Sequence, residues 1–184
     1  PGDVGEEDLG DNEAWGVVAR ATIAPGYTPG RFFHAGVSTR YRTPDARTGG
    51  GDRVRFRAYP EAHLDRTRFL DTGNITGVDA YQQLWGEAAG VYGPLSLQVE
   101  NNWTRILRSD AADPMIGGGY AFISWFVTGE SRPYDLLNGV FLQPVPRRPL
   151  GALELAVRYS VMDMNELDVT GGFGQNWTFG VNWY

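Results

Sequence analysis

Arginine side chains recur at every second position in several segments of the chain. All sixteen basic residues are Arg, and the sequence contains no Lys. A guanidinium group is a planar fork that binds carboxylate or phosphate through paired hydrogen bonds. Six arginines fall on the polar side of an alternating pattern: Arg40, Arg42, Arg53, Arg55, Arg57 and Arg158. If that side lines a water-filled lumen, these residues form a basic track that guides anions.

Carboxylates in the same polar pattern offer a second interpretation. Glu87, Glu100 and Glu154 can form ion pairs with the arginines, so that the charged side chains facing the lumen neutralise one another. In a wide pore, opposed acidic and basic residues set a transverse field without selecting one ion. We favour this pairing, although Glu87 alternates together with Trp85 and Val91, so the direction of its side chain is open.

Three further arginines, Arg132, Arg147 and Arg148, lie in the polar, Pro-rich span 129–149. If that span folds into the lumen, they form a constriction. If it lies on the surface, they are solubilising charge. The sequence leaves both interpretations open.

Other chemistry finds little support in the sequence. His34 and His63 are isolated and there is no Cys, so we expect no metal site and no cofactor. No Ser-His-Asp set or carboxylate pair is fixed by spacing, so we expect no catalytic residue and no enzyme activity. The net charge of -6 argues against a nucleic-acid partner.

The stretch 153–161 indicates which kind of secondary structure places the charged side chains. Taken at period two, its large apolar residues share one face: Leu153, Leu155, Val157, Tyr159 and Val161. Glu154 and Arg158 fall on the opposite face, whereas a helix would wrap the apolar residues right round the cylinder. A strand that is apolar outside and charged inside is typical of a water-filled transmembrane barrel.

The same pattern predicts about eight strands, over 14–24, 33–42, 54–58, 78–92, 95–102, 120–128, 153–164 and 176–183. The tight connection at Gly93-Pro94 predicts a hairpin and hence antiparallel pairing. We therefore expect an all-β, antiparallel transmembrane β-barrel over residues 14–184, preceded by an acidic loop or terminal segment over 1–13. About eight strands can close a small barrel filled by side chains, or form part of a larger wall.

Besides a polar loop over 43–52, loops are predicted over 61–73, 108–119, 129–149 and 165–172. If the turn at Gly93 is periplasmic, counting crossings places 61–73, 108–119 and 165–172 outside and 129–149 on the periplasmic side. That span is long for the short-turn side and is a candidate to fold into the lumen. Asp110 and Asp113 predict an acidic outer tip, either solvated or touching divalent ions between lipopolysaccharide headgroups.

Five stretches, in order, resemble the C-terminal half of the phosphate-selective porin O and P family. They are 54–63 (VRFRAYPEAH), 91–98 (VYGPLSLQ), 127–134 (VTGESRPY), 151–160 (GALELAVRYS) and 180–184 (GVNWY). The resemblance implies part of a sixteen-stranded barrel, usually a homotrimer, in the outer membrane of a Gram-negative bacterium. Its surroundings are then the lipid bilayer and lipopolysaccharide, and its permeant solutes are small anions such as phosphate.

The sequence departs from that family in being acidic and free of Lys, and it stops before the family's last strands. The matched motifs are architectural, so no binding residue of the family is carried over. We expect a porin for passive diffusion of small hydrophilic solutes, with a preference for anions. The alternatives are an outer-membrane barrel that serves as an anchor or scaffold with a plugged pore, and a soluble β-sandwich binding module.

Overall fold

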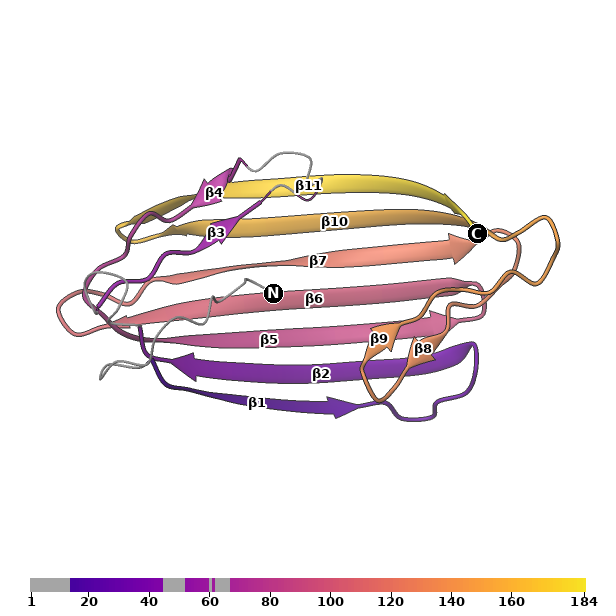
Figure 1. The fold of residues 1–184 in the computed structure, drawn as a ribbon, viewed down its shortest axis with the longest axis horizontal. Coiled ribbons are helices and arrows are strands. Elements are labelled where there is room, and N and C mark those ends of the chain that lie inside the picture. Colours follow the sequence, from indigo (N-terminus) through magenta and orange to yellow (C-terminus); the bar gives the residue numbers. More distant parts are fainter. Residues whose placement is uncertain (1–13, 45–51, 60, 62–66) are drawn as a thin grey trace.

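One antiparallel sheet of seven strands organises the protein (Figure 1). The computed structural model describes residues 14–44, 52–59, 61 and 67–184. The strands of the main sheet are β1 (Gly16–Ile23), β2 (Arg31–Arg42), β5 (Val78–Tyr92), β6 (Leu95–Arg108), β7 (Met115–Phe126), β10 (Leu153–Glu166) and β11 (Val169–Trp183). Each pairs with its neighbour in chain order, so the prediction of an all-β, antiparallel fold is confirmed.

The sheet is open, with β1 at one edge and β11 at the other (Figure 1). Within the described ranges neither edge strand has a partner on its far side, so a closed barrel is not seen. No helix among these residues is long and apolar enough to cross a membrane.

The predicted third strand, over 54–58, is wrong. Only Arg57–Ala58 form a strand there, β3, which pairs with β4 (Leu70–Asp71) in a separate two-stranded sheet. The alternation arises because Val54, Phe56 and Ala58 pack against an apolar cluster on one face of the main sheet. The apolar side of this segment therefore covers the sheet and does not extend it. A second small sheet pairs β8 (Tyr134–Asp135) with β9 (Val140–Phe141).

Two predicted loops are shorter than expected, because glycines in them belong to strands. Gly118 lies in β7, where an added Cβ would come within 2.9 Å of the Met162 Sδ atom on β10. Gly171 lies in β11, where an added Cβ would lie 2.6 Å from the Met164 Cβ atom. At these positions glycine allows the neighbouring strand β10 to approach closely, and it does not mark a break in the strand. The loops 108–119 and 165–172 accordingly shrink to 109–114 and 167–168.

The turns lie at two ends of the sheet. The Gly93 end carries the connection 24–30, the Gly93-Pro94 hairpin and the segment 127–152; the Asp168 end carries 43–77, 109–114 and 167–168. Gly93 has a φ of 57°. The first residue of this two-residue hairpin turn needs a positive φ, which glycine adopts most readily because it has no Cβ atom. The topology confirms the predicted grouping of the connections. Each end, however, has both a long and a short connection, so loop length does not distinguish periplasm from exterior.

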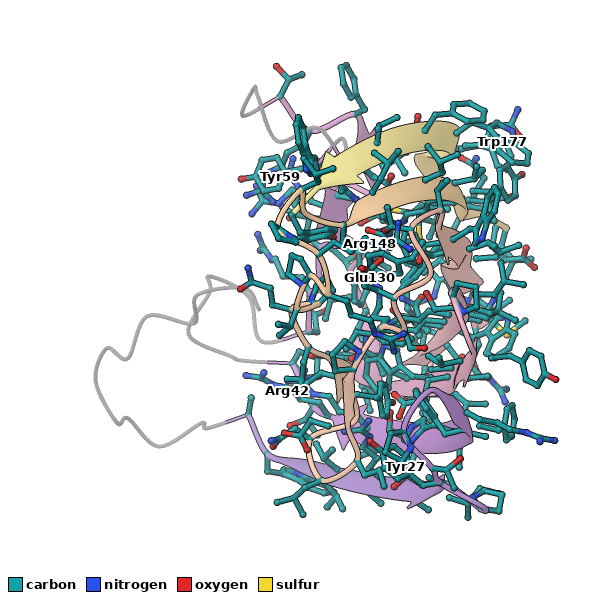
Figure 2. All side chains as sticks on the ribbon, turned by 90° about the vertical axis from the view of Figure 1, so that its right-hand side faces the viewer. Tyr27, Arg42, Tyr59, Glu130, Arg148 and Trp177 are labelled. Atoms are coloured by element: carbon teal, nitrogen blue, oxygen red, sulfur yellow. The ribbon has the colours of Figure 1, made fainter. Side chains whose placement is uncertain are left out.

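The two faces of the sheet differ sharply in character. We call the face that carries Glu154 and Arg158 the inner face, and the opposite face the outer face. Figure 2 shows the sheet curved, with Arg42 and Tyr59 on the inner side and Trp177 on the outer side. Large apolar residues of the outer face are exposed, with Trp183 78%, Phe179 75% and Val181 71% accessible.

Two small cores lie on the inner face, one near each end. At the Asp168 end, Ile75, Val78, Ile106, Ile116, Met164 and Val169 pack together beneath the β3–β4 segment. At the Gly93 end, Phe32, Ala89 and Val91 pack against Tyr134 and Phe141 of β8 and β9. The described parts of both long connections therefore fold over the inner face, and a polar band remains between them.

Candidate functional site

The polar band is built by strand register. Glu87 on β5 faces Glu100 on β6, Glu100 faces Tyr120 on β7, and Tyr120 faces Ser160 on β10. Side chains directly opposite one another on adjacent strands point to the same face, so these four form a row across the sheet. Like charges directly opposite are destabilising, and Glu87 and Glu100 therefore need partners.

Glu87 obtains its partners from β1 and β2. It forms an ion pair with Arg20 and a hydrogen bond of 3.0 Å with the His34 Nε2 atom. Gly36 stands between them, and an added Cβ there would lie 2.5 Å from the Glu87 Oε1 atom. Because position 36 has no side chain, the Glu87 carboxylate can extend across β2 and reach Arg20.

Glu100 is satisfied by neutral donors. The Gln98 amide donates to it over 2.7 Å, and the Tyr120 hydroxyl is a second donor. No described Arg or His forms an ion pair with Glu100.

Arg158 is held on the band by an aromatic ring and a carboxylate. Its guanidinium lies 4.0 Å from the centroid of the Tyr120 ring and pairs with Glu61 at 3.1 Å. Burial raises the pKa of Glu61, but hydrogen bonds from Ser160 and Asn176 and the charge of Arg158 outweigh it, so this pKa lies below its ordinary value. Arg158 is thus a compensated charge.

Glu154 is fully buried at the Gly93 end. It pairs with Arg132 and accepts hydrogen bonds from the Asn182 amide at 2.9 Å and the Tyr184 hydroxyl at 2.8 Å. Arg132 also faces the rings of Phe122, Phe126 and Phe141 at 5.7–5.8 Å from their centroids. The segment 127–152 is therefore fixed to the inner face by a buried ion pair.

A second carboxylate of that segment, Glu130, is 1% exposed and was not singled out from the sequence. The Thr128 hydroxyl and the backbone N–H of Arg147, at 3.2 Å, donate to it and hold its pKa below the ordinary value. Arg147 and Arg148, the other predicted constriction residues, are exposed. The structure thus brings only Arg132 of the three onto the sheet.

Arg40 and Arg42 lie on the inner face of β2 towards the Asp168 end, opposite Gln83 and Tyr81 of β5. Neither forms an ion pair with a carboxylate of the described residues, in contrast to Arg20, Arg132 and Arg158.

Arg53, Arg55 and Arg57 do not lie on a strand of the main sheet, because their segment covers that sheet at the Asp168 end. The Arg55 Nε donates to Asp71 over 2.7 Å, and this bond, with a backbone donor from Gly73, lowers the pKa of Asp71 to about 2. Arg55 therefore ties β4 to the preceding chain.

Two adjacent cavities open along the polar band, with volumes of about 560 Å³ and about 500 Å³. The first is lined by Arg20, Trp85 and Glu87, and the second by Tyr59, Glu61 and Arg158, among others. They share Asn102, Gly119 and Tyr120, and we call the pair the central groove. Among the described side chains, no three His, Asp or Glu residues come together as metal ligands.

Sequence reasoning overlooked Arg20, although it alternates with apolar residues in the first predicted strand just as Arg40 does in the second. Period two alone places it with the other polar residues. Glu130 carried no such signal, because its burial depends on how the segment 127–152 turns over the sheet.

The chain resembles known proteins along most of its length. Residues 4–184 match the model of the family described as phosphate-selective porin O and P. An uncharacterised protein of Caulobacter vibrioides is 33% identical over 186 residues, which cover 97% of this chain and 36% of that protein. Porin O of Pseudomonas aeruginosa is 29% identical over 190 residues, which cover 90% of this chain and 43% of that protein. The chain therefore spans less than half the length of these relatives.

Proposed function

Because the chain belongs to the phosphate-selective porin O and P family, we propose that its sheet forms part of the wall of an outer-membrane channel. Small hydrophilic solutes then cross by passive diffusion along the inner face. No step of this process needs an enzyme activity or a cofactor.

The segregation of the two faces carries the proposal. Trp183, Phe179 and Val181 expose most of their surface on the outer face, while Glu87, Glu100 and Arg158 lie on the inner face. Exposing so many large apolar side chains to water is unfavourable, and contact with lipid removes that cost. A soluble β-sandwich would need polar residues on its outward face.

Closure of the wall requires partners for the free edges of β1 and β11, since unpaired edges do not persist in hydrocarbon. We propose that further strands pair with both edges to complete a sixteen-stranded barrel. The Gly93 end then faces the periplasm, and the barrel assembles as a homotrimer surrounded by phospholipid and lipopolysaccharide.

An anion preference within this channel is assigned to Arg40 and Arg42. Three other inner-face arginines are compensated by Glu87, Glu154 and Glu61, so they contribute little net field. Of the predicted pore-lining residues on the main sheet, Glu87, Glu154 and Arg158 are ion-paired, whereas Arg40 and Arg42, near the Asp168 end, form no ion pair with a described carboxylate. Small anions are the proposed permeant ions, and phosphate is one of them.

The folded-back segments support a second candidate function. Both long connections pack on the inner face, as they would in a plugged barrel that serves as an anchor or scaffold. Single-channel recording of the native protein in planar bilayers separates the two functions. A channel gives discrete, ohmic current steps in potassium chloride, whereas a plugged scaffold inserts without conducting.

A further inference from the structure

The central groove carries no excess of positive charge. Its described lining contains two arginines, Arg20 and Arg158, and three carboxylates, Glu61, Glu87 and Glu100. Both arginines are already ion-paired, and Glu100 accepts hydrogen bonds from the neutral Gln98 and Tyr120 side chains. A phosphate placed here would meet no uncompensated cation among the described residues, so the groove is poorly suited to an inorganic anion.

The groove does offer an aromatic surface beside a free amide. Trp85 on β5 faces Asn102 on β6 directly across the strand pair, with both side chains on the inner face. The Trp85 ring stacks on no other described ring, and the Asn102 side chain makes no hydrogen bond with a described residue. Gly118, the partner of Asn102 on β7, also lines the first cavity of the groove.

We propose that the central groove binds an uncharged, sugar-like solute. The apolar C–H face of such a ring packs on Trp85, and its hydroxyl groups exchange hydrogen bonds with Asn102, whose amide offers both donors and an acceptor. Adjacent hydroxyls reach the Glu87 carboxylate and the Arg20 guanidinium, which both line the same cavity. Each cavity of the groove, at about 560 Å³ and about 500 Å³, has room for one sugar ring. The inference rests on the proposed channel function, because the solute reaches the groove through the lumen.

The test is titration of single-channel conductance with maltose, and separately with inorganic phosphate, using the native protein in planar bilayers. Maltose is expected to reduce the single-channel current, and the reduction should level off as the maltose concentration rises. Trp85→Leu should raise the half-blocking maltose concentration about tenfold, as loss of an aromatic contact predicts. Asn102→Leu should also raise it, whereas Trp85→Phe should retain most of the block.

Phe122→Leu is the matched control, because Phe122 lies on the inner face of β7 but outside the groove. It should leave the half-blocking concentration unchanged. Current steps without saturable maltose block, or equal effects of Trp85→Leu and Phe122→Leu, would overturn the inference while leaving the channel function intact. Saturable block by phosphate that depends on Trp85 would identify an anion site instead. Absence of any ion current would overturn the channel function and this inference together.

Discussion

The fully buried Glu154 carboxylate on β10 pairs with the Arg132 guanidinium in the segment between β7 and β10. Removing one partner of a buried pair leaves an uncompensated charge, at a cost of about 3–5 kcal/mol. We therefore expect Arg132→Leu to release the segment 127–152 from the inner face. Hydrogen–deuterium exchange of that segment should rise markedly, while exchange in β5 and β6 stays slow.

Two further variants sharpen this prediction. Arg148→Leu removes an exposed arginine of the same segment and should leave exchange unchanged. Combining Arg132→Leu with Glu154→Leu removes both charges and should restore much of the protection. Equal exchange in Arg132→Leu and Arg148→Leu would show that the ion pair does not hold the segment.

The β10–β11 turn offers a stabilising substitution. Leu167 has a φ of 54°, in the left-handed region that non-glycine residues avoid, and its side chain is exposed. Leu167→Gly should therefore raise the free energy of unfolding by about 1 kcal/mol, since relief of strain outweighs glycine's greater chain entropy. Urea unfolding in detergent measures the difference. Leu137→Gly, at an exposed position without positive φ, is the control and should bring no gain.

Alternation along the chain predicted all seven strands of the main sheet, although the bounds of β6, β7 and β11 differ from the predicted 95–102, 120–128 and 176–183. Over 120–128 both faces are apolar or aromatic, so the pattern left the inward face of that strand open. Glu87 shows how far the pattern extends. Its neighbours Trp85 and Val91 left its direction open in sequence, but strand register places all three on the inner face. They differ in surroundings, since Val91 is covered by the β8–β9 segment while Glu87 lines the central groove.

The errors have a common physical origin. At 54–58 the alternation arises from packing onto the sheet, and period two cannot tell such a covering segment from a wall strand. The predicted loops 108–119 and 165–172 included Gly118 and Gly171, which belong to β7 and β11 at points where β10 approaches closely. The burial of Glu130 depends on contacts between distant parts of one segment, which no local pattern encodes.

The Arg55–Asp71 pair predicts a pH dependence at the Asp168 end. The hydrogen bond from Arg55 lowers the pKa of Asp71 to about 2, below its ordinary value of 3.8. A lowered folded-state pKa means that the stabilisation is complete above the unfolded value and is lost as the pH falls towards 2. Exchange of residues 52–59 and 67–75, normalised to the intrinsic rate, should therefore rise between about pH 4 and pH 2. Asp71→Asn cannot form the ion pair, so its exchange should be high at every pH. If exchange in Asp71→Asn still rose as the pH fell, Asp71 would be excluded as the cause of the rise.

Ion selectivity provides the last prediction. Arg40 and Arg42 are the inner-face arginines of β2 and pair with no described carboxylate, so in the proposed channel their field would act on permeating ions. Replacing both with Ser should lower the anion-to-cation permeability ratio by a factor on the order of 2, and less at high salt because of screening. Reversal potentials under a potassium chloride gradient measure this ratio. Arg31→Ser is the matched control, since Arg31 lies at the end of the same strand on the outer face and should leave the ratio unchanged. Cation selectivity in the unmodified protein, or an equal effect of Arg31→Ser, would refute the assignment of anion preference to Arg40 and Arg42.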